Sequence, residues 1–329
     1  MTLNARRANM ASDANASARE IFLSDVIGGL SKSRKRLEPK YFYDARGADL
    51  FNQICQLDAY YPTRTETGIL DTNADDIAHY LGTDAVLVEY GAGSLEKVRI
   101  LLDAISNPVA LIAVDISADQ LDRAANDVRA AYPELEVLHV AADFTRPIDL
   151  PEPARVGGNP VVFFPGSTIG NFDPDDAIEF MVGARDTVGP GGMLLIGVDL
   201  KKDSARLEIA YDDPAGVTAA FNLNLLTRIN RELGGDFDLD TFNHVARYNT
   251  NLGRIEMHLK STKAQTVTIN GQPFDFAEGE TIHTENSYKY SIEEFQALAE
   301  RAGFKPMQVW TDAENLFAVH LFKVAADTS

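Results

Sequence analysis

Apolar residues from Asp84 onward alternate between short continuous runs and segments with helical spacing. Ala85–Tyr90 is a short apolar run that ends in a glycine-rich turn, and Glu96–Ile105 then places apolar residues at helical spacing. Four more strands and a second helix follow in the same way. They are predicted at Ala110–Asp115, Ala118–Ala131 (the helix), Leu135–Val140, Pro160–Pro165 and Met193–Leu200. Apolar strands that alternate with amphipathic helices are typical of a parallel sheet covered on both faces.

The pattern changes after Leu200. Tyr211–Leu233 has helical spacing, whereas His244–Ser261 and Gln265–Ile269 have the character of strands connected by turns such as Asn270-Gly271. This part of the chain is therefore predicted to be an α+β insertion in the α/β fold.

The α/β pattern returns at Ser291, where the sequence Ser-Ile-Glu-Glu is a capping box that opens a helix. Two further strands, Lys305–Trp310 and Leu316–Val324, are predicted to complete the sheet. The changes of pattern divide the chain into two domains. We predict one from residues 62–200 with 290–329 and a second from residues 18–61 with 201–289, after a frayed or disordered start at residues 1–17.

Charge excludes some classes of partner. The 329 residues include 49 Asp and Glu against 30 Lys and Arg, which gives a net charge of -19. Such a charge repels phosphate backbones and anionic lipids. We therefore expect no nucleic acid as partner. We also expect no membrane as partner, because no apolar run in the sequence approaches the length of a membrane span.

Cysteine and histidine usage argues against disulfide and metal chemistry. Cys55 is the single cysteine, which suits a reducing compartment, and we expect a cytoplasmic protein. The six histidines are scattered without the spacing of metal ligands, so no metal is expected.

The glycine-rich turn Glu89–Ser94 lies between a predicted strand and a predicted helix, where backbone N–H groups favour an anionic group. A dinucleotide fingerprint would have glycine at position 96, but Glu96 stands there, which disfavours a nicotinamide-linked oxidoreductase. The pattern Glu-x-Gly-x-Gly instead resembles the S-adenosylmethionine site of class I methyltransferases. Asp115, at a strand end, is placed to accept the two ribose hydroxyls, and Asp143-Phe144 to meet the adenine; ordinary turn and cap roles are the alternatives.

Residues 165–172 follow the fourth strand with the sequence Pro-Gly-Ser-Thr-Ile-Gly-Asn-Phe. In an open α/β sheet this edge faces the ligand crevice, so the substrate is expected here. Asn171 could donate a hydrogen bond to a substrate carboxylate. Its alternative role is to cap the helix predicted to begin near Asp173.

Several longer motifs recur in order from about residue 20 to the C-terminus. They are Pro39–Asp44 with Gly47 and Leu50-Phe51, Tyr60–Glu66, Glu89–Lys97, Gly166–Asn171, Ala210–Asp213, Asn222–Leu233 and Thr284–Ser287. Together they resemble the histidine-specific Nα-methyltransferases of ergothioneine biosynthesis. The resemblance implies a class I, Rossmann-like methyltransferase sheet with an interleaved second α+β domain, and an enzyme that trimethylates the α-amino group of L-histidine to hercynine. We expect the protein to be a monomer.

The resemblance also implies roles for individual residues, with histidine held between the two domains. The S-adenosylmethionine site would comprise Gly91, Lys97, Asp115, Asp143 and Phe144. The substrate carboxylate would contact Asn171 and Tyr211, and the imidazole would lie among Tyr60, Glu285 and Ser287. Tyr43, Gly166 and Met257 would line the same pocket, with Tyr43 placed to assist proton loss from the amine.

Two other functions remain open. A methyltransferase for another amino acid, such as a tryptophan derivative, would share this scaffold and differ mainly around Glu285 and Ser287. A protein that binds S-adenosylmethionine without transferring the methyl group would also share it.

Overall fold

The computed structural model describes residues 18–93, 95–115, 118–142, 144, 148 and 158–325. Residues 1–17, for which the sequence predicts a frayed start, lie outside the described residues. The chain divides into two compact units. Unit 1 comprises the segment up to Tyr61 and Asp203–Asn286, and unit 2 comprises Pro62–Lys202 and the segment from Ser287.

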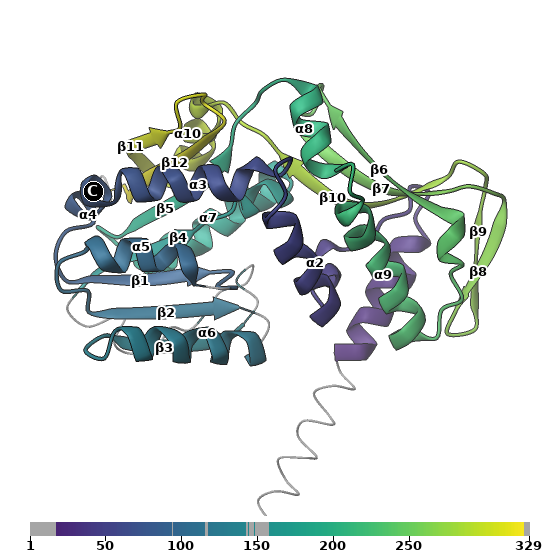
Figure 1. The fold of residues 1–329 in the computed structure, drawn as a ribbon, viewed down its shortest axis with the longest axis horizontal. Helices are drawn as coiled ribbons and strands as arrows, with labels where there is room; N and C mark the ends of the chain where they lie inside the picture. The colour runs from purple at the N-terminus through teal and green to yellow at the C-terminus, as the bar shows by residue number, and fades with distance from the viewer. Residues whose placement is uncertain are drawn as a thin grey trace, which may run out of the picture. The chain divides into compact units, whose positions relative to one another are not determined.

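A seven-stranded sheet forms the centre of unit 2, in the order β11-β12-β5-β4-β1-β2-β3 (Figure 1). Strands β1 to β5 run parallel to one another, whereas β12 is antiparallel to both of its neighbours, β5 and β11. The predicted α/β class with a Rossmann-like sheet is thus confirmed. The strands are β1 (Ala85–Tyr90), β2 (Ala110–Asp115), β3 (Glu136–Ala141), β4 (Asn159–Phe164), β5 (Met193–Asp199), β11 (Phe304–Thr311) and β12 (Phe317–Val324).

The antiparallel β12 departs from the fully parallel sheet that the apolar runs predict. Only five residues separate the end of β11 at Thr311 from the start of β12 at Phe317. A connection this short makes a hairpin, because parallel neighbours need a crossover of about a dozen residues or more.

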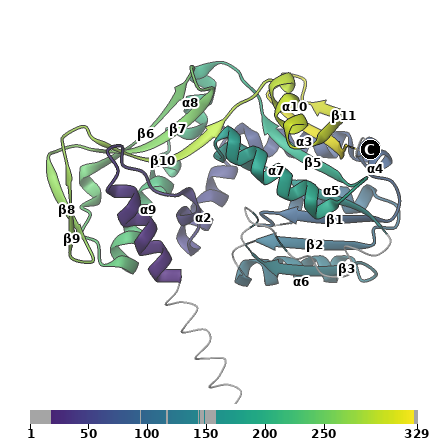
Figure 2. The ribbon, with the colours of Figure 1, turned by 180° about the vertical axis from the view of Figure 1, so that it is seen from behind.

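Helices cover both faces of the sheet. Residues of α3 (Tyr61–Thr72), α4 (Ala74–Leu81), α5 (Glu96–Ala104) and α6 (Ala118–Ala131) belong to one apolar cluster. Residues of α7 (Pro174–Val188) and α10 (Ile292–Arg301) belong to the other cluster. In the reverse view of Figure 2, α7 lies in front of the sheet. The central strands β1, β2 and β5 are apolar along almost their whole length because both their faces are buried in this way, whereas β3 and β11 at the two edges of the sheet include exposed residues.

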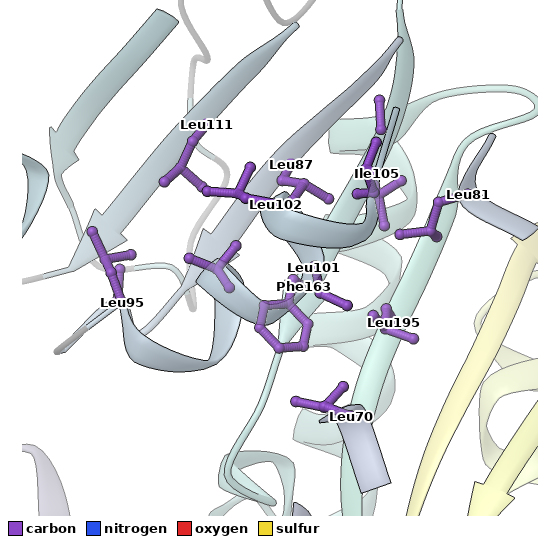
Figure 3. Packing of buried hydrophobic residues seen from close by; sticks show 14 of the residues in the cluster. Leu70, Leu81, Leu87, Leu95, Leu101, Leu102, Ile105, Leu111, Phe163 and Leu195 are labelled. Atoms are coloured by element: carbon purple, nitrogen blue, oxygen red, sulfur yellow. The ribbon is translucent and has the colours of Figure 1, made fainter. Parts of the chain in front are cut away.

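Alternation along β1 divides its side chains between the two clusters. Leu87 joins the first cluster, and its neighbours Val86 and Val88 join the second. In Figure 3, Leu87 lies among Leu102 and Phe163, which come from α5 and β4. Full burial of each such side chain contributes roughly 1.5–3 kcal/mol.

Unit 1 combines helices with two small sheets. The three-stranded sheet has the order β10-β7-β6, and β8 pairs with β9 in an antiparallel hairpin. The strands are β6 (Phe242–Asn249), β7 (Arg254–Ser261), β8 (Gln265–Ile269), β9 (Gln272–Phe276) and β10 (Thr281–Tyr288), whose last residues reach into unit 2. The helices are one at 18–30, η1 (Pro39–Phe42), α2 (Ala45–Cys55), α8 (Ser204–Tyr211), α9 (Val217–Leu233) and η4 (Leu239–Thr241).

The prediction of one helix over Tyr211–Leu233 is wrong at its beginning. The helix α8 ends at Tyr211 and α9 begins at Val217, after a turn that contains Pro214. The carboxylate of Asp213 accepts hydrogen bonds from the backbone N–H groups of Val217 and Thr218, at 3.1 and 2.8 Å. A proline and a side-chain cap together favour a new helix start over a continuous helix.

Among the described residues, no helix combines the length and apolar character needed to cross a membrane.

Candidate functional site

The glycine-rich turn follows β1 at the carboxyl edge of the sheet. Gly91 has a φ of +70°, in the region that favours glycine, and its N–H donates to the carbonyl of Val114 at 2.9 Å. A Cβ on Gly91 would lie 3.7 Å from the ring of Phe144. Gly91 therefore lets the chain turn directly beside that ring, whereas Ser94 lies outside the described residues.

The predicted cofactor residues Asp115 and Phe144 lie near the same turn. Asp115 is the last residue of β2, and the adjacent Val114 pairs with Tyr90 of β1. The Phe144 ring stacks on Tyr90 with the centroids 5.9 Å apart and the planes 11° apart. Asp143 lies outside the described residues, so its role remains a prediction.

Lys97 on α5 forms an ion pair with Glu66, a residue of α3 to which the sequence assigns no role. The Glu66 carboxylate also accepts the backbone N–H of Gly166, at 3.0 and 2.8 Å from its two oxygens. Glu66 thus links a predicted cofactor residue to a predicted substrate residue. Its position gives a signal in the sequence, because Ile69 and Leu70 follow at i+3 and i+4 on the buried face of the helix.

Glu89, at the end of β1, is a second buried carboxyl group near Lys97. Burial raises the pKa of Glu89 to about 8, and the nearby Lys97 only partly opposes this. Its Oε2 has no hydrogen-bond partner within the described part of the chain. A buried carboxyl oxygen without a partner among the described residues can accept a hydrogen bond from a ligand at the glycine turn or, when protonated, donate one to it.

The turn after β4 carries Gly166 and Asn171. Gly166 has a φ of +85°, and Asn171 ends the short helix η3 (Thr168–Asn171) as a partly exposed residue. The alternative in which Asn171 caps the next helix is wrong, because Asp173 occupies the N-cap position of α7. The predicted contact between Asn171 and a substrate carboxylate stays a proposal.

Ser287 is held at the same edge of the sheet by Lys289 and Asp199. The Lys289 ammonium donates to Ser287 Oγ at 2.8 Å and pairs with Asp199 at 2.6 Å. Burial acts to raise the pKa of Asp199, but Lys289 and Lys202 outweigh it and hold the pKa below its usual range. Asp199 is therefore ionised, and Ser287 Oγ accepts a hydrogen bond from the Lys289 ammonium.

Three tyrosines with predicted roles lie in unit 1. Tyr60 and Tyr211 are buried, with ring centroids 6.0 Å apart in an edge-to-face arrangement. Burial raises the pKa of Tyr60 well above its usual value, with additional contributions from Tyr211 and Glu285 among others. Tyr43 is 42% exposed, and its ring packs edge-on against Phe221.

Met257 and Glu285 come from neighbouring strands of unit 1. Met257 on β7 is buried, and its carbonyl accepts the hydroxyl of Thr284 at 3.1 Å. Glu285 on β10 follows Thr284 directly and is partly exposed. Tyr43, Tyr60 and Tyr211 lie in one region of unit 1, because Tyr43 and Tyr60 both contact the ring of Phe51 and Tyr60 contacts Tyr211. Glu285 contributes to the raised pKa of Tyr60.

Within the described ranges, no three His, Cys, Asp or Glu residues come together in a group that could hold a metal ion.

Comparison with known proteins adds a family and several relatives. The model of a family described as histidine-specific, S-adenosylmethionine-dependent methyltransferases matches residues 22–324. A histidine N-alpha-methyltransferase of Mycolicibacterium smegmatis is 46% identical over 310 residues, which cover 93% of this chain and 95% of that protein. The protein of the same description from Mycobacterium tuberculosis is 42% identical, covering 90% and 93%. An L-tryptophan methyltransferase of Psilocybe serbica is 29% identical, covering 87% and 88%.

Proposed function

Because the chain belongs to the family of histidine-specific, S-adenosylmethionine-dependent methyltransferases, we propose that it methylates the α-amino nitrogen of L-histidine. Three successive transfers would give the trimethylammonium betaine hercynine, the first step of ergothioneine biosynthesis. The observation that carries this proposal is the family match over residues 22–324, almost the full described chain.

We propose that Gly91, Lys97, Asp115, Asp143 and Phe144 hold S-adenosylmethionine. The glycine at position 91, with its positive φ, supports a ligand that approaches the backbone of the turn closely. The buried Glu89 Oε2, with no partner among described residues, supports a ligand that brings its own hydrogen-bonding group. Lys97, whose ammonium also pairs with Glu66, would supply a cation for the ligand's carboxylate.

For the substrate, we propose that Asn171 and Tyr211 take the carboxylate and that Tyr60, Glu285 and Ser287 surround the imidazole. Gly166 and Met257 would line the same pocket. The positions of Glu285 and Ser287, two residues apart on β10, support this arrangement because such side chains share one face of a strand.

When bound, the sulfonium supplies an electrophilic methyl group. The protein must hold a neutral amine in line with the leaving sulfur, and such positioning can supply roughly 7–11 kcal/mol of barrier reduction. An ammonium has no lone pair, so one proton must leave the nitrogen before each of the three transfers. The exposed phenol of Tyr43 is proposed to assist this proton loss, directly or through solvent.

Further parts of the proposal concern the whole molecule. Unit 2 would bind S-adenosylmethionine and unit 1 would contribute to substrate binding. The net charge of -19 supports the absence of a nucleic-acid partner, and the single cysteine supports a cytoplasmic location. We also propose that the protein is a monomer.

Methylation of a tryptophan derivative is the second candidate function, favoured by the likeness to the Psilocybe serbica enzyme. A mass-spectrometric assay with S-adenosylmethionine and a panel of amino acids separates the candidates. We expect products 14, 28 and 42 mass units heavier than histidine, since each methyl group replaces one hydrogen. Methylated tryptophan without methylated histidine would favour the second candidate, and bound S-adenosylmethionine without any product would indicate a binding protein.

A further inference from the structure

His244 on β6 is a buried histidine in unit 1 to which none of the roles above applies. Its side chain is 2% exposed, and its two ring nitrogens contact two different elements. Nδ1 lies 2.8 Å from the amide nitrogen of Asn222 on α9, and Nε2 lies 2.8 Å from the carbonyl oxygen of Tyr211. The ring therefore connects α9 with the last residue of α8.

The partners of the ring fix its tautomer. An amide nitrogen only donates hydrogen bonds, and a carbonyl oxygen only accepts them. Asn222 also donates to the carbonyl of His258 at 3.2 Å, so its amide cannot be reversed without losing that bond. Nδ1 must then accept from Asn222, which leaves the hydrogen on Nε2, facing the Tyr211 carbonyl. Burial lowers the pKa of His244, although the Tyr211 carbonyl and two nearby carboxylates oppose it, and this favours the same neutral ring.

The carbonyl that His244 holds belongs to the end of α8. The last carbonyl groups of a helix have no N–H partner inside the helix. Tyr211 ends α8, and the following Asp212 has a non-helical backbone, with a φ of -143° and a ψ of 67°. Three residues before Tyr211, the carboxylate of Glu208 accepts the backbone N–H of Tyr248 on β6 at 2.9 Å. Two hydrogen bonds thus attach α8 to β6, and the helix lies beside this strand in both views (Figures 1 and 2).

We propose that His244 is a positioning residue that holds the end of α8 so that the phenol of Tyr211 meets the substrate carboxylate. This inference rests on the proposed function, in which Tyr211 contacts that carboxylate. Tyr211 is buried, and a buried aromatic side chain has few rotamers, so the place of its hydroxyl follows from the place of its backbone. Loss of the Nε2–H bond should therefore weaken the contact with the carboxylate and spare the contacts with the imidazole.

The test measures the binding of two ligands that differ at the carboxylate. L-Histidinamide keeps the ring and the amine of L-histidine but carries a neutral amide in place of the carboxylate. Calorimetry gives the Kd of each ligand in the presence of S-adenosylhomocysteine, which has no methyl group to transfer. The decisive quantity for each variant is the Kd for histidinamide divided by the Kd for histidine. A general loss of stability weakens both ligands alike and does not move this ratio.

Two substitutions of His244 separate the hydrogen bond from the packing. His244→Gln keeps an amide N–H that can reach the Tyr211 carbonyl, whereas His244→Met fills a similar volume without a donor. His244→Leu is a second version of the apolar variant. The matched control is Phe242→Leu on the same strand, because this buried ring packs edge-on against Phe237 and Phe276. Circular dichroism checks the fold of each protein, and Tyr211→Phe tests the phenol itself.

We expect the ratio to fall about fivefold or more in His244→Met and in Tyr211→Phe, and to change less than about twofold in His244→Gln and Phe242→Leu. An unchanged ratio in His244→Met, together with a fall in Tyr211→Phe, would overturn the role of His244 and leave the proposed function standing. An equal fall in His244→Gln and His244→Met would also overturn it, because packing and not the N–H would then control the ratio. A fall of the same size in Phe242→Leu would have the same meaning.

The result for Tyr211→Phe decides how far a failure extends. An unchanged ratio in this variant would overturn the inference together with the assignment of Tyr211 to the carboxylate. Absence of histidine methylation by the unmodified protein would refute the proposed function itself.

Discussion

Glu66 holds the backbone N–H of Gly166 between both oxygens of its carboxylate, at 3.0 and 2.8 Å, although 100 positions separate the two residues. The same carboxylate pairs with Lys97 and is almost fully closed off from solvent. One side chain thus connects the helix after the glycine-rich turn with the turn that follows β4.

Replacing Glu66 by Gln should destabilise unit 2. The amide oxygen can still accept from Gly166, but Lys97 loses its negative partner in a mostly buried site. Loss of one partner of a buried ion pair costs about 3–5 kcal/mol, and the 18% exposure of the Lys97 side chain puts the expected loss near the lower limit. Urea unfolding measures it, with Glu300→Gln on the exposed face of α10 as a control that should change little. Equal stability of the two variants would show that the Glu66–Lys97 pair is unimportant.

Gly197→Ala should disturb the same carboxylate. A Cβ on Gly197 would lie 1.8 Å from Glu66 Oε1, so either the strand or the carboxylate must move. Overpacking of this kind costs roughly 1–3 kcal/mol. The matched control is Gly183→Ala in α7, where nothing lies within 4 Å and alanine should stabilise the helix by about 0.5–1 kcal/mol. Thermal unfolding of both variants should therefore shift in opposite directions, and a shift in the same direction would contradict the reported packing.

Glu285→Ala should change substrate preference. Under the proposed function, the carboxylate accepts a hydrogen bond from the imidazole and disfavours an apolar ring that leaves it unpaired. Histidine should lose roughly 1.5–3 kcal/mol in transition-state binding, while tryptophan gains relative to it. The measurement is the ratio of kcat/KM for histidine and tryptophan in both proteins. A ratio that does not move toward tryptophan would remove Glu285 from the imidazole site.

His320 on β12 should make stability depend on pH. It is fully buried, and neither ring nitrogen has a hydrogen-bond partner among the described residues. Burial lowers its pKa from 6.5 to about 4, so the folded protein keeps the ring neutral while the unfolded chain takes up a proton below pH 6.5. This contribution to stability is complete above the unfolded pKa and is lost as the pH falls from 6.5 toward 4, by about 2 kcal/mol at pH 5.

His320→Leu removes that titration. The loss of unfolding free energy between pH 7 and pH 5, measured in urea, should be smaller in the variant than in the unmodified protein. Other buried histidines, such as His258 with a pKa of about 4, keep titrating in both proteins. Parallel pH profiles for the two proteins would mean that His320 is not held neutral by burial.

The strands of unit 2 could be predicted because local apolar runs report burial on both faces of a sheet. Ala85–Tyr90 and Ala110–Asp115 have the predicted bounds, and the run predicted at Pro160–Pro165 forms a strand one residue earlier. The place of β12 between β5 and β11 could not be predicted, because pairing of strands depends on contacts between distant segments. The break between α8 and α9 was signalled by Pro214, but the apolar spacing on both sides obscured it.

The candidate site shows the same division. The place of Gly91 in the turn could be predicted, because a tight turn between a strand and a helix requires a backbone conformation that glycine adopts most easily. Glu66 and Lys289 were not assigned roles, since a charged residue is most often solvated. Only the spacing of Glu66 to Ile69 and Leu70 indicated that this carboxylate lies on the buried face of its helix. Their partners, Gly166 and Asp199, lie 100 and 90 positions away, beyond any periodicity that a sequence window reports.

The interior position of β12 also has a consequence for the order of synthesis. β12 is the last strand in the described part of the chain, yet it pairs with β5 on one side and β11 on the other. A nascent chain that has already produced β1 to β5 still exposes one edge of β5, and the whole of Asp203–Asn286 is translated before that edge can be covered. Exposed strand edges pair readily with other chains. The growing polypeptide is therefore most vulnerable to aggregation between the completion of β5 and the emergence of Phe317–Val324, and slow translation in this interval would lengthen that exposure.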